Sequence, residues 1–266
     1  MLAPCKINIF LEIVGKRDDG YHEIRTIFMP LDAPFDEIML DKAEKGIKIE
    51  CDDENLPIDD KNICWRAAKK FADACGIDAS WKISIKKRIP VAAGLGGGSS
   101  DAATVLKILD QLYPGRCDIR KIAVSLGADV SYFLNPVPSL GAGIGECLSP
   151  LKSNPRLPVL IINPVFPVSS AWSYQNFKRS ATPIKIGSML KAIENGDLAQ
   201  ISESLRNDLA PALYFKFPLL GMIRESILKL GALNAEISGS GPTLFAIFPD
   251  DKYLEQVSID LKKKYP

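Results

Sequence analysis

A glycine-rich segment placed directly before an amphipathic pattern is the feature that most constrains this chain. Residues 90–103 read PVAAGLGGGSSDAA, with four glycines and two adjacent serines ahead of an apolar pattern typical of a helix. A backbone without Cβ atoms can approach a phosphate closely, and the unpaired N–H groups at a helix start carry partial positive charge. The segment therefore predicts an anion-binding loop for a phosphate or a nucleotide.

Two common phosphate loops do not fit this spacing. A Walker A motif ends in Gly-Lys-Ser/Thr, whereas Gly98 precedes Ser99 here. In the dinucleotide fingerprint G-x-G-x-x-G, the third glycine would fall at Ser99, and the segment is not part of an N-terminal strand-helix-strand unit. A plain turn between a strand at 81–85 and a helix at 99–112 is also disfavoured, because ordering so much glycine costs conformational entropy.

Charge and hydropathy exclude several classes of partner. The 266 residues are 47% hydrophobic and carry 33 Lys and Arg against 32 Asp and Glu, a formal net charge of +1. No overall field recruits nucleic acid or an anionic membrane, so a charged ligand must be held by a local site. The N-terminus lacks a basic segment followed by an apolar one, and no run approaches the length of a membrane span. We expect a cytoplasmic protein that is a monomer or a weak homodimer.

The cysteines and histidine do not form a metal-binding pattern. Six cysteines are scattered without a C-x-x-C pair, and His22 is the single histidine. A structural zinc site is therefore improbable. We expect buried thiols in a reducing compartment and no metal site built from cysteine or histidine.

Apolar periodicity predicts an α+β protein. Residues 7–14 alternate at strand period and lead through a turn at 15–20 into a second strand, which predicts a hairpin. The strands expected are 7–14, 21–31, 37–40, 47–51, 81–85, 140–148, 159–162 and 243–248. The helices expected are 62–75, 99–112, 119–126, a short one opened by Asp129, 169–177, 184–193, 197–205, 218–230 and 251–264. The proline-rich stretch 150–158 is the best linker, so we expect domains at 1–152 and 153–266.

Four segments resemble the GHMP small-molecule kinases. Residues 90–103 are similar to that family's phosphate motif, in which Pro, small residues and Gly-Leu-Gly precede Ser-Ser. Residues 4–11 with 20–24 resemble the N-terminal signature of one branch, the 4-diphosphocytidyl-2-C-methylerythritol kinases, and 127–134 resemble its catalytic segment. Residues 237–243 are similar to the C-terminal glycine motif of the superfamily. The segments occur in the family's order and span nearly the whole chain.

The resemblance implies a two-domain fold and a reaction. The N-terminal domain would be similar to the second domain of ribosomal protein S5, and the C-terminal domain would be ferredoxin-like. The activity implied is ATP-dependent phosphorylation of the C2 hydroxyl of 4-diphosphocytidyl-2-C-methyl-D-erythritol, a step of the non-mevalonate route to isoprenoid precursors. A GHMP kinase for another small alcohol, or a catalytically silent nucleotide-binding regulator, are the alternatives. A dinucleotide-dependent oxidoreductase is a remote third.

Lys6 and Asp129 are the catalytic residues that the resemblance implies. By spacing alone, Asp129 is a carboxylate that caps a helix, and Lys6 is an exposed lysine near the start of a strand. The family pattern instead makes Asp129 the base or orienter of the acceptor hydroxyl. Lys6 then becomes its electrostatic partner, which neutralises charge as the phosphoryl group moves.

Substrate and nucleotide residues follow from the same resemblance. Asn8 lies two residues after Lys6, so both side chains leave the strand on one side. Tyr21 and His22 are expected to contact a sugar and a pyrimidine edge, and Tyr174 to stack on cytosine, with Trp172 or Phe177 as alternatives. Substrate contacts from Gly239 and Ser240, and ATP with Mg²⁺ as cofactor, complete the implied site. The ATP-binding residues implied are Gly94, Leu95, Gly96, Gly97, Gly98, Ser99, Ser100, Asn62 and Lys87, with Ser99 and Ser100 also near Mg²⁺.

Overall fold

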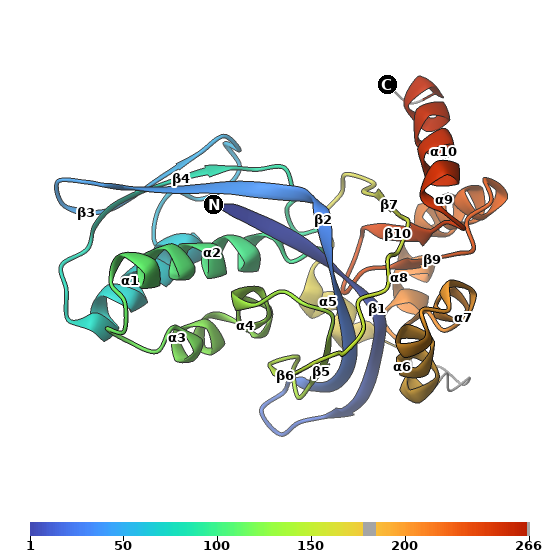
Figure 1. The fold of residues 1–266 in the computed structure, drawn as a ribbon, viewed down its shortest axis with the longest axis horizontal. Coiled ribbons are helices and arrows are strands. Elements are labelled where there is room, and N and C mark those ends of the chain that lie inside the picture. The colour runs from blue at the N-terminus through green and yellow to red at the C-terminus, as the bar shows by residue number, and fades with distance from the viewer. Residues whose placement is uncertain (178–184, 265–266) are drawn as a thin grey trace. The chain divides into compact units, whose positions relative to one another are not determined.

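The structure is a computed structural model that describes residues 1–177 and 185–264, and two compact units interleave along its chain (Figure 1). Two long strands contribute to both units: β1 (Leu2–Lys16) and β2 (His22–Lys42). The N-terminal unit comprises Met1–Lys6, Pro30–Val91 and Gly96–Pro136, and the C-terminal unit comprises Ile7–Met29, Ala92–Leu95 and Val137–Pro266. Helices and strands alternate irregularly in both, so the expected α+β class is confirmed.

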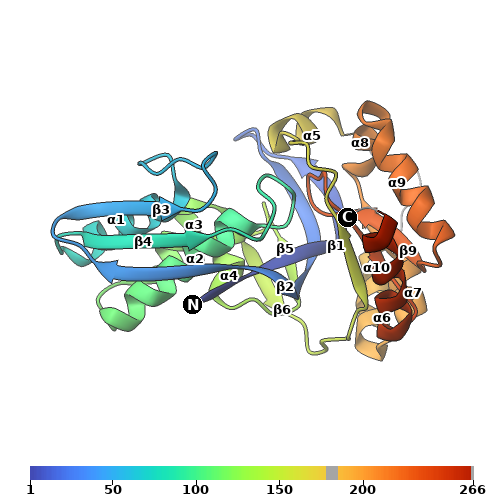
Figure 2. The same cartoon turned by 90° about the horizontal axis from the view of Figure 1, so that it is seen from above.

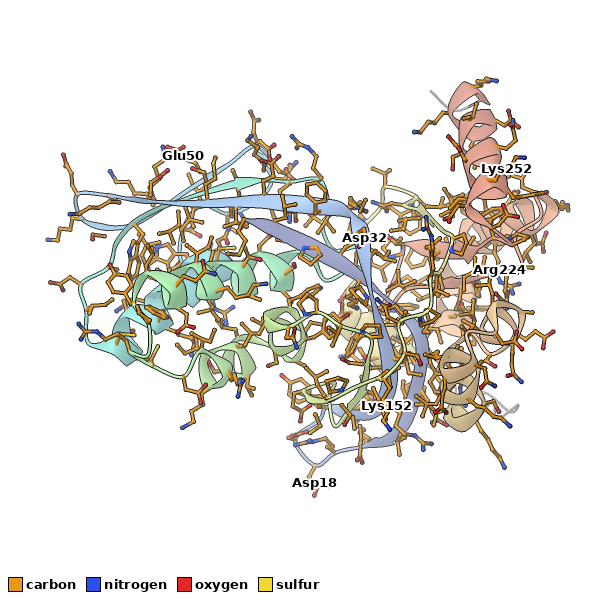
Figure 3. All side chains as sticks on the ribbon, in the orientation of Figure 1. Asp18, Asp32, Glu50, Lys152, Arg224 and Lys252 are labelled. Carbon is orange, nitrogen blue, oxygen red and sulfur yellow. The ribbon has the colours of Figure 1, made fainter. Side chains whose placement is uncertain are left out.

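The N-terminal unit is a sheet with helices on one face (Figures 1 and 2). In the sheet, β4 (Ser80–Lys86) lies between β2, to which it is antiparallel, and β3 (Gly46–Cys51), to which it is parallel. Trp81, Ile83 and Ile85 alternate toward the buried face, whereas Glu50 lies on the solvent face and pairs with Lys82 (Figure 3). The helices are α1 (Ile63–Cys75), α2 (Gly97–Leu112), α3 (Ile119–Leu126) and α4 (Ala128–Leu134).

Capping residues explain where α1 begins and ends. The Asn62 side chain accepts a hydrogen bond from the Cys64 N–H at 2.8 Å, which satisfies one of the free donors at the helix start. Gly76 ends the helix in the left-handed region, with φ 62°. The expected helix at 62–75 is therefore confirmed.

The C-terminal unit contains a three-stranded antiparallel sheet and two smaller additions. Its central strand β10 (Leu244–Ile247) lies between β7 (Val159–Ile162) and β9 (Asn234–Ile237). In addition, β5 (Ser139–Ala142) pairs with β2 and β6 (Cys147–Pro150), and β8 (Arg206–Asn207) runs parallel to β1. The helices are α5 (Ser170–Asn176), α6 (Ile186–Asn195), α7 (Leu198–Glu203), α8 (Ala210–Lys216), α9 (Pro218–Lys229) and α10 (Asp251–Lys264).

Every residue of β10 is buried. Ala246 packs with Ile227 of α9 and Val257 of α10. Leu244, two residues earlier and on the same face of the strand, packs with Leu213 of α8 and Leu11 of β1. Arg224 of α9 donates to the Ala235 carbonyl at 2.8 Å and so ties this helix to β9 (Figure 3). The buried strand expected at 243–248 is confirmed.

Several expected boundaries were wrong. The strands expected at 21–31 and 37–40 form one continuous strand, β2, and the strand expected at 140–148 is divided into β5 and β6 by a turn around Gly143 and Gly145. Helix α2 begins at Gly97, two residues earlier than expected. The elements α8, β8 and β9 were not expected, and Ile184, the expected start of α6, lies outside the described residues.

The expectation of buried thiols holds for two of the six cysteines. Cys5 and Cys64 are buried, whereas Cys147 is exposed on the short strand β6, and Cys51, Cys75 and Cys117 are half-buried. Burial raises the pKa of Cys5 to about 12, so this thiol stays protonated at neutral pH.

Candidate active site

The glycine loop approaches neighbouring backbone and side chains too closely for larger residues. Gly94 and Gly96 both have positive φ, 79° and 75°, where side chains are strained. A Cβ on Gly94 would lie 2.1 Å from the Ser238 carbonyl oxygen, and one on Gly96 would lie 2.7 Å from the Phe133 ring. Gly96 precedes the first turn of α2, where N–H groups lack helical partners. The loop thus has a backbone without side chains that a phosphate could approach closely, and N–H groups at the start of α2 that could bind an anion.

Lys6 and Asp129 lie together in the N-terminal unit. The Lys6 Nζ is 3.5 Å from the Asp129 Oδ2, although 122 residues separate them in sequence. The Lys6 side chain is 5% exposed and that of Asp129 is 35% exposed. The lysine is therefore buried rather than solvated, which differs from the ordinary behaviour of a lysine near a strand's start. Its carboxylate partner keeps one side open to solvent.

Asp129 occupies the first turn of α4, where the N-terminal end of the helix favours negative charge. The N-cap is Gly127, so Asp129 is not the capping residue of this helix. Phe133, one turn further along α4, contacts Gly96 of the loop, and the Lys6 Cε lies 3.2 Å from the position of a Cβ on Gly96. The ion pair is therefore adjacent to the glycine loop within one compact unit.

Lys87 is held by two buried carboxylates. Its Nζ donates to Asp36 Oδ2 and, at 2.7 Å, to Asp101 Oδ2, and all three side chains are nearly inaccessible to solvent. Burial lowers the pKa of Lys87, but the two carboxylates outweigh that effect and raise it above its usual value. Burial, and the nearby negative charge of Asp36, raise the pKa of Asp101 to about 7 even though the Lys87 ammonium lowers it. The ammonium expected to contact ATP thus lies in a buried charge cluster, which we call the Asp36–Lys87–Asp101 cluster.

Asn62 is likewise engaged within the N-terminal unit. Besides capping α1, its Nδ2 donates to the Pro57 carbonyl at 2.7 Å, and the residue is 6% exposed. Among the ATP residues implied by the resemblance, the loop residues from Gly96 to Ser100, Asn62 and Lys87 belong to this unit. Gly94 and Leu95 belong to the C-terminal unit.

An aromatic group surrounds His22 in the C-terminal unit. The Tyr174 ring stacks on the imidazole at 5.6 Å between centroids, and the Phe177 ring meets it edge-on at 5.2 Å. Trp172 packs instead against Phe217, with the Lys216 Nζ 3.9 Å above its ring. Burial, and the nearby charge of Lys16, lower the pKa of His22, which favours the neutral imidazole.

The other predicted substrate residues also lie in the C-terminal unit. Asn8 is buried, and its Nδ2 donates to the Thr26 Oγ1 at 2.8 Å. Tyr21 is 61% exposed and lies in the turn before β2, which begins at His22 and not at Tyr21 as expected.

Gly239 and Ser240 form a tight turn that α5 and β8 hold in place. The Asn207 Nδ2 donates to the Gly239 carbonyl at 2.8 Å. The Ser240 hydroxyl lies 2.7 Å from that of Ser170, and the Ser173 hydroxyl donates to the Ser240 carbonyl at 3.2 Å. These contacts fix the turn against the helix that carries Tyr174.

Sequence reasoning missed Asp36, Asp101 and Ser238, which all contact predicted site residues. Asp36 and Asp101 contact Lys87, and the Ser238 hydroxyl contacts the Gly94 carbonyl. No periodic pattern links residues 36, 87 and 101. Asp101 and Ser238 both lie inside the quoted glycine motifs, and that position is the signal that could have identified them.

Comparison with known families gives two matches. A model described as "GHMP kinases N terminal domain" matches residues 62–135, and one described as "GHMP kinases C terminal" matches residues 189–266. The first match contains the glycine loop, α4 and Asp129, and the second contains the Ser238 turn.

Curated relatives match over nearly their full length. A protein of Clostridium botulinum (strain Loch Maree / Type A3) named 4-diphosphocytidyl-2-C-methyl-D-erythritol kinase is 38% identical, with 99% of this chain and 95% of the relative covered. One of the same name from Geobacter sp. (strain M21) is 40% identical, with 99% and 94% covered.

Solved structures match as well. One described as 4-(cytidine 5'-diphospho)-2C-methyl-D-erythritol kinase superposes with a TM-score of 0.85 at 31% identity and covers 99% of this chain and 95% of its own. Homoserine kinase from Cytophaga hutchinsonii, at 21% identity and a TM-score of 0.74 over 97% and 90% of the chains, shares the fold. In the described part of the chain, every helix is too short or too polar to cross a bilayer.

Proposed function

We propose that this chain, which belongs to the GHMP kinases, transfers the γ-phosphoryl group of ATP to the C2 hydroxyl of 4-diphosphocytidyl-2-C-methyl-D-erythritol. Within the GHMP kinases it belongs to the 4-diphosphocytidyl-2-C-methyl-D-erythritol kinases. The product is the 2-phosphate, an intermediate of the non-mevalonate route to isoprenoids. The observation that carries this proposal beyond the relatives' names is the Lys6–Asp129 pair beside Gly96 of the glycine loop.

Asp129 and Lys6 have complementary roles in the proposed reaction. Phosphoryl transfer depends on positioning and on charge stabilisation more than on covalent help from the protein. The partly exposed Asp129 carboxylate can accept a hydrogen bond from the acceptor hydroxyl and take its proton. The buried Lys6 ammonium, 3.5 Å from that carboxylate, holds it in place and offsets the negative charge of the migrating group.

The loop from Gly94 to Ser100 would hold the ATP phosphates through the backbone amides that precede Ser100, since the Ser100 N–H donates to the Gly96 carbonyl at 2.9 Å. Asn62 and Lys87 would lie nearer the purine. Ser100 is buried, and its hydroxyl lacks a hydrogen-bond partner among the described residues. A hydroxyl oxygen in that state fits Mg²⁺, which prefers oxygen ligands and retains several waters. When bound, Mg²⁺ neutralises phosphate charge, and Ser100 and the half-buried Ser99 are the residues that would contact it.

The cytidine end of the substrate would be recognised by the group around His22. A neutral imidazole both donates and accepts hydrogen bonds, which suits a pyrimidine edge. Tyr174 and Phe177 are the aromatic residues beside His22, and either ring provides a stacking surface for the base. Trp172 is less suited, because it packs against Phe217 and Lys216. Asn8, Tyr21, Gly239 and Ser240 complete the proposed contacts.

Three further properties stay predictions. These are the division into domains at 1–152 and 153–266, the cytoplasmic location, and the monomeric or weakly dimeric state.

The decisive experiment is phosphoryl transfer from ATP with Mg²⁺ by the purified full chain. We expect turnover with 4-diphosphocytidyl-2-C-methyl-D-erythritol and none with methylerythritol phosphate, which lacks the cytidine. Homoserine and mevalonate serve as acceptors of other GHMP kinases. Turnover with one of these instead would replace the proposed substrate, and ATP binding without transfer to any acceptor would favour the silent regulator.

A further inference from the structure

Ser238 is a buried residue whose hydroxyl joins two segments that are far apart in sequence. It follows β9 directly and is 0% exposed. Its Oγ donates to the Gly94 carbonyl oxygen at 2.9 Å and accepts from the Asn8 N–H at 3.3 Å. One hydroxyl thus acts as donor to the glycine loop and as acceptor from β1, two roles that a hydroxyl can fill at the same time.

The backbone around Ser238 leaves the loop little freedom. The Ser238 N–H donates to the Thr243 carbonyl and its carbonyl accepts from the Gly241 N–H, both at 2.9 Å. A Cβ on Gly94 would lie 2.1 Å from that same Ser238 carbonyl oxygen. The loop therefore passes Ser238 too closely for position 94 to carry a side chain. All these residues belong to the C-terminal unit.

The hydrogen bond to the Gly94 carbonyl controls the orientation of one peptide plane. In a planar trans peptide, the C=O and the following N–H point in opposite directions. Because Ser238 holds the Gly94 oxygen, the Leu95 N–H points away from Ser238. Loss of that contact removes the side-chain restraint on the Gly94 oxygen, so this peptide plane can rotate more readily at a glycine, whose backbone angles are less restricted than those of other residues.

We propose that Ser238 is a positioning residue for ATP binding: it fixes the Gly94–Leu95 peptide so that the loop amides are oriented for the phosphates. This inference rests on the proposed function, in which the loop binds ATP. Through the Asn8 N–H, the same hydroxyl also fixes β1 two residues after Lys6. Ser238 touches neither ATP nor the acceptor in this proposal and acts through Gly94 and β1.

The test is Ser238→Ala in the full chain, with the KM for ATP, the KM for the cytidylated alcohol and kcat measured separately. Loss of a buried hydrogen bond corresponds to roughly a tenfold effect, which we expect mainly as a higher KM for ATP. Ser238→Cys retains a weak donor of similar shape, so its KM for ATP should fall between those of wild type and Ser238→Ala. An unchanged KM for ATP in a folded Ser238→Ala protein would overturn the proposal.

Ser202→Ala is the matched control. Ser202 is also buried in the C-terminal unit, but its hydroxyl lacks a hydrogen-bond partner among the described residues. We expect Ser202→Ala to leave the KM for ATP within about twofold of wild type, since the substitution removes a hydroxyl that makes no hydrogen bond among the described residues. If both variants raise it equally, the effect of Ser238→Ala reflects general loosening and the positioning role is wrong.

Backbone hydrogen exchange separates this proposal from the proposed function. In Ser238→Ala, amide exchange at residues 92–98 should accelerate about tenfold, whereas Ser202→Ala should leave it unchanged. This measurement needs no turnover. A wild-type protein that transfers no phosphoryl group would refute the proposed function, and the exchange rates would still decide whether Ser238 orients the loop.

Discussion

Two buried lysines in the N-terminal unit have opposite surroundings. Lys6 and Lys87 have side chains that are 5% and 7% exposed. The carboxylate near Lys6, that of Asp129, is 35% exposed and lies 3.5 Å away. The carboxylates near Lys87 are 0% and 4% exposed, and the Asp101 Oδ2 lies at 2.7 Å.

This difference in the exposure of the carboxylates separates the Lys6–Asp129 ion pair, which is suited to catalysis, from the carboxylates around Lys87, which are suited to stabilising the fold. A carboxylate that is open to solvent on one side can receive a substrate hydroxyl. A lysine enclosed by two buried carboxylates is held in place. If its ammonium moved to another partner, it would leave buried charges uncompensated, which costs free energy. Burial of a lysine alone therefore does not identify a catalytic residue; the exposure of its partner does.

The Asp36–Lys87–Asp101 cluster joins both ends of the glycine loop. Asp36 Oδ1 accepts hydrogen bonds from the N–H groups of Arg88 and Ile89, which precede the loop, while Asp101 lies in the helix that follows it. The cluster thus restrains the segments on either side of residues 90–100.

The largest effect should come from Asp129→Asn, which keeps the shape and removes the base. We expect phosphoryl transfer to fall about 10²–10⁴-fold, because an amide cannot accept the proton. The melting temperature should fall, because the buried Lys6 ammonium loses the carboxylate beside it, so activity is compared at a temperature where circular dichroism shows the variant folded. Asp118→Asn, in which the amide still caps α3, is the matched control and should retain activity. Full activity in Asp129→Asn would remove Asp129 from the mechanism.

Lys87→Met should have the largest effect on stability. It leaves the Asp36 and Asp101 carboxylates buried without their cation, at a cost of about 3–5 kcal/mol in the free energy of unfolding. Lys6→Met should cost clearly less, because the Asp129 carboxylate remains hydrated. Urea unfolding of both variants measures the comparison. Equal losses would contradict the distinction between the two lysines.

The Asp101 carboxyl should make stability depend on pH. Its pKa is raised in the folded state from 3.8 to about 7, so the folded protein binds this proton more tightly than the unfolded chain. The resulting stabilisation is fully present below pH 3.8 and disappears as the pH rises to about 7. Relative to Asp101→Asn, wild type should lose on the order of 4 kcal/mol across that range. A constant difference between the two proteins from pH 4 to 7, in urea titrations, would refute the raised pKa.

The smallest effect is expected for a third lysine pair, on the surface. Lys69 and Asp73 are one turn apart on α1, with side chains 49% and 60% exposed. Lys69→Ala should change the free energy of unfolding by about 0.5 kcal/mol or less, because water solvates both partners. A loss as large as that of Lys87→Met would mean that exposure does not govern the strength of these pairs.

Local sequence signals predicted those helices and strands whose ends are fixed by capping or turn residues directly beside them. Asn62 and Gly76 delimit α1 through side-chain capping and positive φ, and both signals can be read within a few residues. By contrast, β2 continues through residues 32–36, where we expected a gap between two separate strands. The short helix α8 has Pro211 in its first turn and derives its stability from packing, as through Leu213, which no local pattern reveals.

The site was predictable only through the family resemblance. Lys6 and Asp129 carry no pairing signal in sequence, and the fold brings them together. The Asp36–Lys87–Asp101 cluster was not foreseen, because burial of charges depends on tertiary contacts among β2, β4 and α2. The assigned roles of the site residues stay predictions until the variants are measured.

The interleaved order of the two units has a consequence for synthesis on the ribosome. Residues 7–29 belong to the C-terminal unit but leave the exit tunnel first, and their β8, β9 and β10 neighbours follow some two hundred residues later. At about 5–20 residues per second, this segment waits roughly 10–40 s for its partners. Its apolar residues, among them Leu11 and Ile13, are exposed to solvent or to chaperones during that interval. A nascent chain stalled before residue 230 therefore cannot complete either the sheet around β10 or the Ser238 contact.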